Sequence, residues 1–380
     1  MTLDLNAARD LFEDSTDFTV GIEEEFALLD ATTLNLVPRF EDLMQLVSED
    51  EVLAASAAGE LISSEIEIRS GRGENFPHAV ALQAEHRARL FATASKLGIA
   101  LGAAGAHPWS PWQDQQVIDT EHYHRVEDGL KYVAWRNNTF SLHVHVGVRN
   151  GDRAIAVCDR LRELLPLLLA VSASSPLTEG RDTGLASART QLFTRNFPRC
   201  GVPEPFVDWR GYQDFVEFLI KTNSIVESTQ LWWSVRPHHS FGTVEVRICD
   251  AQPSGERSTA LAGLIVACVA QAARDYDEGL RPQLASGRMI EENLWRAIRY
   301  GLDGKMIDFE RTVEYPAAAI VDNLLQWTAP VRAELGIEPS FDGLDPVTEL
   351  RQHDSLEAAY RASVAQTAAT YGQIRTDATL

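Results

Sequence analysis

Residues 19–30 read TVGIEEEFALLD, with apolar side chains at alternate positions. Alternation at period two is typical of a β-strand with one buried face, because successive side chains in a strand point to opposite sides. One face would carry Val20, Ile22, Phe26 and Leu28, and the other would carry Glu23 and Glu25. Glu24 falls among the apolar set, so we expect it to lie near an edge of the sheet.

Three more segments alternate in the same way, at residues 61–70, 139–149 and 241–250. Each has one apolar face and one face that carries Glu, His or Arg. The polar faces carry Glu65, Glu67 and Arg69 in the first segment, His143 and His145 in the second, and Glu245, Arg247 and Cys249 in the third. An antiparallel sheet with one solvated side is the ordinary explanation for such a pattern.

Helical patterns separate and follow the predicted strands, and no linker interrupts the chain. They cover residues 77–97, 152–173, 211–222, 254–277, 289–300, 317–326 and 355–373. We expect Pro166 to kink the second of these helices. Residues 174–205 form a long polar stretch with Gly and Pro, and a loop of that length is usually functional or disordered. We predict one domain over residues 1–380, with an acidic N-terminal segment 1–17 and a helical C-terminal third 254–380.

Composition excludes several classes of partner. The chain has 380 residues, with 34 Lys and Arg against 55 Asp and Glu, and a net charge of −21. This balance argues against nucleic acids and anionic membranes, which both need excess Lys and Arg. The N-terminus lacks the features of a signal peptide, and the four cysteines are widely spaced, as expected for reduced thiols. We therefore expect a cytoplasmic protein without a disulfide framework or a zinc site.

The polar faces of the predicted strands contain no lysine and are rich in carboxylates. If the strands are neighbours, these carboxylates repel one another, and a bound cation would relieve the repulsion. Sites rich in oxygen ligands suit Mg²⁺ or Mn²⁺ better than zinc. Arg69 and Arg247 lie on the same faces, and magnesium with arginine is the usual pairing at a nucleoside triphosphate whose terminal phosphate is transferred.

Other phosphate-binding and catalytic motifs do not fit. Arg299 stands where a P-loop ending at Gly304-Lys305 needs its first glycine, and Phe76 replaces the third glycine of a dinucleotide-binding loop that starts at Gly71. No nucleophile-elbow motif is present. Two other hypotheses remain open: a metal-dependent hydrolase that uses the same Glu and His face, and a metal-binding homologue with reduced catalysis.

Six motifs in order resemble one family, the YbdK-type carboxylate–amine ligases, also called glutamate–cysteine ligase type 2. They are GIEEEF at 21–26, GAHPW at 105–109, LHVHVG at 142–147, SASSP and DTGLAS within 172–187, WWSVRP at 232–237 and GTVEVR at 242–247. The resemblance covers roughly residues 18–300. It implies an α+β, glutamine-synthetase-like fold, in which flanking helices support a curved antiparallel sheet with the active site on its concave face.

The resemblance also implies an activity. Family members use ATP and two or three Mg²⁺ ions, convert a carboxylate to an acyl phosphate with release of ADP, and let an amine displace the phosphate. Glutamate, through its γ-carboxylate, and cysteine are the substrates of the best-known members. The expected partners are a small-molecule acid and amine, and relatives suggest a homodimer or a higher homo-oligomer.

The resemblance also implies site residues, which can be assigned position by position from the family's motifs. The metal ligands implied by the resemblance are Glu23, Glu25, Glu67, His143 and Glu245. The catalytic and nucleotide-binding candidates are Arg247 and Arg236, joined by His145 and Arg69 for the nucleotide alone. The weaker substrate candidates are Arg189 and Glu65.

Two positions depart from the family's pattern. Ser63 stands where the family often has Glu, so a third metal would be held differently. Ser234 stands where many members have Asp, which could change the orientation of Arg236. We expect the loop 174–205 to shield the acyl phosphate from water.

Several conspicuous residues receive plainer interpretations. Of Trp232 and Trp233, we expect one to be packed and one to line the cleft. The histidines that flank the motifs are expected to be structural or solvated: His122, His124, His238 and His239. We expect Tyr123 and Arg125 to lie in a loop, for which a role in nucleotide binding is one option.

Overall fold

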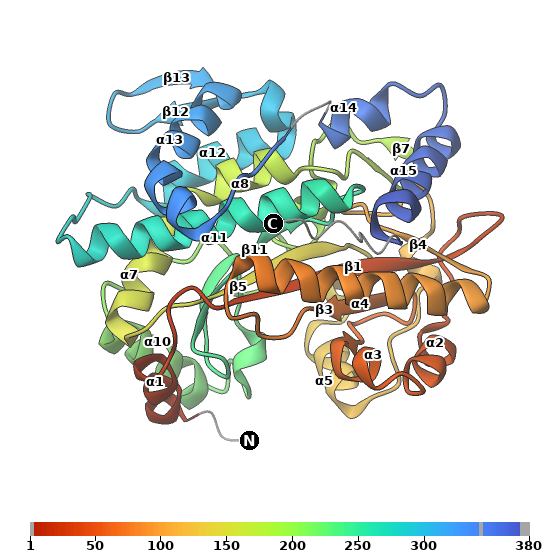
Figure 1. Ribbon diagram of the computed structural model, residues 1–380, viewed down its shortest axis with the longest axis horizontal. Coiled ribbons are helices and arrows are strands. Elements are labelled where there is room, and N and C mark those ends of the chain that lie inside the picture. The colour runs from red at the N-terminus through yellow and green to blue at the C-terminus, as the bar shows by residue number, and fades with distance from the viewer. Residues whose placement is uncertain (1–3, 342–344, 373–380) are drawn as a thin grey trace.

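The fold is built on a seven-stranded antiparallel sheet in a computed structural model that describes residues 4–341 and 345–372. The strand order is β10–β11–β5–β1–β3–β2, and β4 pairs with β1 outside this path. The strands are β1 (Val20–Asp30), β2 (Ala57–Ala58), β3 (Glu65–Arg69), β4 (Ile99–Gly102), β5 (Ser141–Gly147), β10 (Val235–His238) and β11 (Thr243–Asp250). The four predicted strand segments are therefore neighbours, and the α+β expectation is confirmed (Figure 1).

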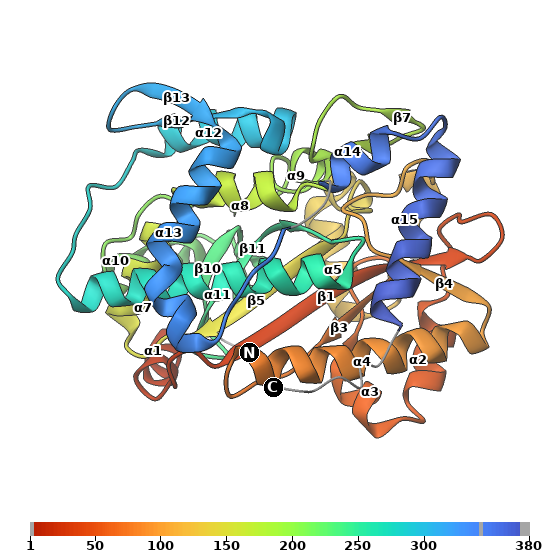
Figure 2. The same cartoon turned by 45° about the horizontal axis from the view of Figure 1, so that its top comes forward.

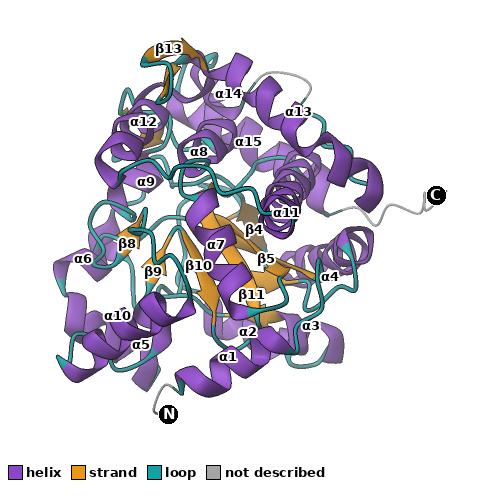
Figure 3. Ribbon diagram, turned by 90° about the vertical axis from the view of Figure 1, so that its left-hand side faces the viewer, coloured by secondary structure: helices purple, strands orange, loops and turns teal. Residues whose placement is uncertain are grey.

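Helices cover one face of this sheet (Figure 2). They are α4 (Phe76–Lys96), α7 (Gly151–Leu161), α8 (Leu165–Ser172) and α11 (Gly255–Asp277). The apolar side chains predicted for the core face, such as Val144 and Val246, pack with this layer in one large hydrophobic cluster. Other segments lie on the opposite face of the sheet (Figure 3). The Glu and His side chains of the predicted polar faces line a cavity there.

Further elements surround the sheet. The N-terminal half adds α1 (Leu5–Glu13), α2 (Phe40–Val47), α3 (Glu51–Ser56), η1 (Trp112–Asp114), α5 (Glu121–Leu130) and α6 (Tyr132–Trp135). The middle adds β6 (Leu177–Thr178), β7 (Arg181–Asp182), α9 (Ala188–Leu192), β8 (Cys200–Gly201), α10 (Trp209–Lys221), η2 (Ser228–Gln230) and β9 (Trp232–Trp233). The C-terminal part adds α12 (Gly287–Tyr300), η3 (Gly301–Asp303), β12 (Lys305–Asp308), β13 (Val313–Pro316), α13 (Ala317–Leu335), α14 (Pro346–Arg351) and α15 (Leu356–Tyr371).

Three helix and strand boundaries in the structure differ from the predicted ones, for local reasons. The helix predicted over 152–173 is not kinked but broken into α7 and α8, because Pro166 fits the first turn of α8, where its missing N–H costs nothing. The strand predicted from residue 61 begins only at Glu65. Phe241 lies in the turn before β11 rather than in the strand, and Gly242 supplies the positive φ of 62° that this turn requires.

Glu24 does not lie near a sheet edge, so that expectation was wrong. It sits on the central strand β1 and is only 3% exposed. Its carboxylate lies 3.0 Å from Arg87 Nε and accepts hydrogen bonds from Gln83 Nε2, at 2.8 Å, and from the hydroxyl of Ser258. A buried carboxylate persists in a core when it is paired and hydrogen-bonded in this way.

Cys249 also differs from expectation. It was placed on the polar face, but it packs in the hydrophobic cluster together with Ile248. The pairing of β11 with β5 shifts register between Val246 and Cys249, and such a bulge reverses the alternation of side chains beyond it. All four cysteines are free thiols, as predicted.

The stretch 174–205 is ordered around a buried acid. Asp250, at the end of β11, accepts hydrogen bonds from the Ser174 N–H at 3.0 Å and from the hydroxyls of Ser175 and Ser187 at 2.7 and 2.9 Å. These bonds fix the first half of the stretch to the sheet.

Among the described residues, no helix has the length and apolar character needed to cross a membrane.

Candidate active site

A cavity of about 300 Å³ opens on the sheet face opposite the helices. It collects every residue predicted for the site: Glu23, Glu25, Glu65, Glu67, Arg69, His143, His145, Arg189, Arg236, Glu245 and Arg247. Strand register explains this gathering, because Glu23 pairs directly with both Arg69 and His143 in adjacent strands. Glu25 faces Glu67 in the same way.

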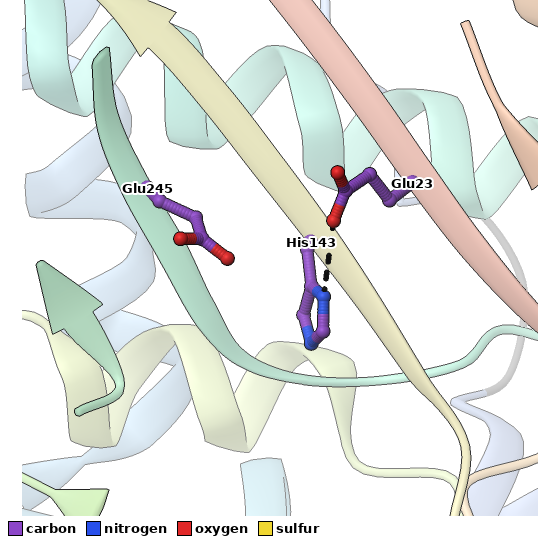
Figure 4. A group of neighbouring side chains, drawn as sticks. All are labelled: Glu23, His143 and Glu245. Atoms are coloured by element: carbon purple, nitrogen blue, oxygen red, sulfur yellow. Dashed lines mark ion pairs between the residues drawn. The ribbon is translucent and has the colours of Figure 1, made fainter. Parts of the chain in front are cut away.

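Glu23, His143 and Glu245 form the first candidate metal group, with one ligand atom of each within 4.8 Å of the others (Figure 4). His143 Nδ1 lies 3.4 Å from Glu23 Oε2, and His145 Nε2 lies 3.3 Å from Glu23 Oε1. Burial opposes ionisation of Glu23, but the attraction of His145 and hydrogen bonds from both histidines outweigh it and hold its pKa well below the usual value.

Glu25, Glu67 and His143 form the second group, so His143 belongs to both. Burial, reinforced by the charge of Arg247, lowers the pKa of His143 and favours the neutral imidazole that a metal ligand requires. Ser141 supports this group, because its N–H donates to Glu25 Oε2 at 2.5 Å and its hydroxyl lies 2.8 Å from His143 Nε2.

Sequence reasoning missed Glu60, which lines the same cavity. Burial and then the nearby charge of Glu25 raise its pKa to about 8, and burial raises the pKa values of Glu65 and Glu67 well above the usual range. Glu60 precedes β3 and belongs to no alternating pattern, so the only signal was a carboxylate next to the predicted strand. Ser63, where the family often has Glu, does not line the cavity.

Glu245 is buried between two guanidinium groups. Arg236 Nε lies 2.6 Å from Glu245 Oε2, and Arg247 donates to the other oxygen. Burial raises the pKa of Glu245, but Arg236 and then Arg247 outweigh this effect, and the pKa lies well below the usual value. Arg247 Nε is buried without a hydrogen-bond partner among the described residues, which leaves it available to an anion in the cavity.

Arg189 and Arg69 differ in how far their guanidinium groups are available to a substrate. Arg189 lines the cavity, but its guanidinium donates to the carbonyls of Ile248 and Arg247 at 3.1 and 3.2 Å and lies 3.7 Å from Asp250. Most of its guanidinium donors therefore contact acceptors of the protein itself, and its role in substrate binding stays a prediction. Arg69 is the more open of the two, with Nε 3.4 Å from Glu67 Oε1.

Aromatic and histidine side chains complete the walls. Trp232 lines the cavity with Phe193 and Phe197, whereas Trp233 is buried in the core, as expected of this pair. Tyr123 also lines it and donates from its hydroxyl to the Gly59 carbonyl.

The flanking histidines have protein partners or are buried. His122 lines the cavity and pairs with Glu227 at 3.2 Å, while His124 pairs with Asp119 on the surface. His239 shares a 2.5 Å hydrogen bond with Tyr212. His238 lines the cavity, and burial lowers its pKa to about 3, which keeps it neutral. Tyr123 and Arg125 lie in the helix α5 and not in a loop, so that expectation was wrong. Arg125 pairs with the exposed Glu121 and is absent from the cavity wall.

The donor set fits a hard divalent cation. Six carboxylates and four imidazoles line one small space, and oxygen-rich sets of this kind match Mg²⁺ or Mn²⁺. Burial, and after it the charges of the neighbouring carboxylates, raises the pKa values of Glu60, Glu65 and Glu67. A metal-assisted reaction on an anionic substrate beside Arg247 is the chemistry that this arrangement suits.

Comparisons with known proteins give one consistent family. The chain matches the family model described as "Glutamate-cysteine ligase family 2" over residues 19–359. A protein of Sorangium cellulosum (strain So ce56), provisionally named glutamate–cysteine ligase 2, is 40% identical over 310 residues, 82% of each chain. A protein of Solibacter usitatus (strain Ellin6076) with the same provisional name is 37% identical over 319 residues, which cover 84% of this chain and 82% of that one.

A solved structure supports the fold. The crystal structure of glutamate–cysteine ligase from Francisella tularensis, in complex with AMP, superposes with a TM-score of 0.67 and 12% sequence identity. The superposition covers 96% of this chain and 91% of that chain.

Proposed function

Because the chain belongs to glutamate–cysteine ligase family 2 and is thereby an ATP-dependent carboxylate–amine ligase, we propose that it joins glutamate to an amine through an acyl phosphate. The carboxylate would be the γ-carboxylate, and the cations Mg²⁺ or Mn²⁺. The family supports the ligase class, and the acid groups of the cavity support the metal requirement. The single observation that carries the proposal is that two groups of metal-ligating side chains share His143 directly beside Arg247.

The proposed reaction has two steps, phosphoryl transfer and amide formation. A carboxylate oxygen of the substrate bonds to the γ-phosphorus of ATP, and the bond to the bridging oxygen breaks to release ADP. The amine nitrogen then bonds to the acyl carbon, inorganic phosphate leaves, and the amine loses a proton. No covalent bond to the protein is needed, so the chain's task is to position the reactants and stabilise charge.

Each part of the cavity has a role in these steps. Glu23, Glu245 and His143 would hold one cation, and Glu25 and Glu67 a second, with Glu60 close to that second group. Bound there, the cations would neutralise the phosphate oxygens.

The arginines act on the substrate anions. Arg247 donates toward the transferred phosphoryl group from its unpaired Nε. With a cation on Glu245, Arg236 would lose this carboxylate acceptor but keep its hydrogen bond to the Leu231 carbonyl, and its other donors would be available to an anionic substrate.

The decisive assay is ADP release with Mg²⁺, glutamate and a panel of amines, together with hydroxylamine as a trap for the acyl phosphate. We expect ADP release that depends on the acid and yields a γ-glutamyl hydroxamate. ADP release that no carboxylate stimulates would refute the proposal.

A metal-dependent hydrolase is the alternative that the same Glu and His face allows. Such an enzyme would need no nucleotide. Stabilisation of the protein by Mg²⁺ with a non-hydrolysable ATP analogue separates the two, because only a protein that binds the nucleotide gains thermal stability from it.

A further inference from the structure

A cavity of about 560 Å³, the helix-side cavity, lies on the helix-covered side of the sheet. Its walls come from α4, from the N-terminal part of α11, from α14 and α15, and from residues 337–341. The helices α4, α11 and α15 pack against one another there (Figure 2). Among the described residues, none lines both this cavity and the candidate active site, so the two spaces are separate.

Two buried arginines line the helix-side cavity. The exposed fraction is 5% for Arg87 of α4 and 8% for Arg257 of α11. Arg87 Nε lies 3.0 Å from Glu24 Oε2, and Arg257 Nη2 donates to the Val171 carbonyl at 2.9 Å. Within residues 4–341 and 345–372, Arg257 Nε has no hydrogen-bond partner, and none is found for Arg257 Nη1 or for Nη1 and Nη2 of Arg87. Buried guanidinium donors without acceptors are costly, so these arginines favour an anionic ligand.

The N-terminus of α11 brings a further positive charge to the same place. The helix begins at Gly255, and a long helix carries a partial positive charge at its first turn. A Cβ at Gly255 would lie 3.2 Å from Arg87 Nη1, so the guanidinium group lies directly against this turn. Two positive groups in contact repel each other, and a carboxylate bound between them would relieve that repulsion.

Carboxylates also line the helix-side cavity. Glu256 and Glu338 are exposed, and Glu349 of α14 is partly buried. Glu349 and Asp345 attract the charge of Arg257, but burial dominates and lowers the pKa of this arginine. The lining therefore holds groups of both signs, and the neighbouring carboxylates compensate the burial of Arg257 only in part.

Apolar side chains form the rest of the wall. Phe76 and Val80 come from α4, Ala260 comes from α11, and Ile337 and Phe341 come from the segment after α13. The volume, and the combination of apolar walls with a few charged groups, match an ordinary small-molecule site. A ligand that fits this lining needs a carboxylate, an ammonium group and an apolar side chain.

We propose that the helix-side cavity is a binding site for a small α-amino acid with an apolar side chain. Its carboxylate bonds to the guanidinium groups of Arg87 and Arg257 at the N-terminus of α11. Its ammonium group bonds to Glu338 and Glu349, and its side chain lies against Phe76. The nucleotide and the reactants of the proposed ligase reaction do not occupy this cavity, so the site is independent of the proposed function.

Titration calorimetry of the full-length protein with three probes tests the chemical class of the ligand. L-Norleucine carries both charges and an apolar chain, hexanoate lacks the ammonium group, and pentylamine lacks the carboxylate. We expect norleucine to bind and each of the other two probes to bind at least about 10-fold more weakly, because each loses its hydrogen bonds to charged groups of the protein.

Substitutions in the cavity wall test the location of the site. Arg257→Met removes one guanidinium group, and Ala84→Trp fills the cavity from α4. Each should weaken norleucine binding about 10-fold or more. The matched control is Ala81→Trp, at an exposed position of the same helix outside the cavity, which should change binding less than about twofold. Circular dichroism checks folding, and Ala84→Trp keeps the test decisive if the Arg257→Met protein does not fold.

Three results would overturn the inference. Failure of the wild-type protein to bind norleucine would remove the site. Binding of hexanoate or pentylamine as tight as that of norleucine would exclude an amino acid as its ligand. Norleucine binding that neither Arg257→Met nor Ala84→Trp weakens would place the probe elsewhere on the protein. The proposed function would stand in all three cases, because no probe reports on the ligase reaction.

Discussion

Arg236 and Glu245 face each other across the β10–β11 hairpin, with Nε 2.6 Å from Oε2. Glu245 is 1% exposed and also belongs to the first metal group. One carboxylate therefore serves as a counter-ion to an arginine and as a candidate metal ligand. We expect a cation bound at Glu245 to compete with Arg236 for this carboxylate, which would couple metal binding to anion binding.

Substitution of Glu245 tests this coupling. Glu245→Asp keeps the charge but withdraws the carboxylate by one methylene. We expect the rate of ADP release to fall at least about 100-fold while the fold is kept. Substitutions of residues that merely contact metal ligands already reduce metal affinity or activity about 10- to 100-fold. The measurements are ADP release and the circular dichroism spectrum. Glu245→Gln should in addition lower the thermal midpoint, because it leaves Arg236 and Arg247 without a buried counter-charge. Near-normal turnover in both variants would remove Glu245 from the site.

The acid cluster predicts a pH dependence of the metal-free protein. The pKa of Glu60 is about 8 in the folded state, against about 4.5 for an exposed Glu, and those of Glu65 and Glu67 are also raised. The folded state thus retains protons that the unfolded state releases. This contribution to stability is complete below about pH 4.5 and is lost as pH rises through 8.

We therefore expect the thermal midpoint of the metal-free protein to fall between pH 6 and pH 8.5, and Mg²⁺ to restore it at the higher pH. Differential scanning calorimetry with and without chelator measures both effects. Glu60→Gln should flatten the decline. A midpoint that is the same at both pH values, with no response to Mg²⁺, would show that these carboxylates do not repel one another.

The buried pair of Glu24 and Arg87 stabilises the packing of α4 on β1. Arg87→Met removes the guanidinium but keeps most of the side-chain volume, and it leaves Glu24 charged and buried. We expect a loss of about 3–5 kcal/mol in the free energy of unfolding, measured by urea denaturation. Arg89→Met, on the same helix but at the surface, should unfold close to the wild type. Equal effects of the two substitutions would contradict the account of Glu24.

Asp250 should control the order of the stretch 174–190. Asp250→Asn replaces one of the oxygens that accept from Ser174, Ser175 and Ser187 by a donor, so a buried hydrogen bond is lost. We expect faster trypsin cleavage at the exposed Arg181. If the stretch shields the acyl phosphate, more ADP should also be released per amide formed. Unchanged cleavage and unchanged coupling would assign the shielding role to another segment.

The sequence by itself determined which side chains share a face of each strand. Side-chain direction alternates along any extended chain, so Glu23, His143 and Glu245 could be assigned to polar faces without knowledge of the fold. The charges of these side chains supported the next inference. Carboxylates on neighbouring strands repel one another, and a bound cation would relieve that repulsion. All eleven predicted site residues line one cavity, ten of them from strands of the sheet and Arg189 from α9.

Tertiary structure decided everything that depends on contacts between distant segments. Glu60 enters the cavity from outside any periodic pattern, and Glu24 finds its counter-ion on α4 rather than in solvent. A bulge turns Cys249 into the core, and the carbonyls of β11 take up the donors of Arg189. Register shifts and the pairing of buried charges follow from packing, which couples residues far apart in the chain, and no local pattern contains that information.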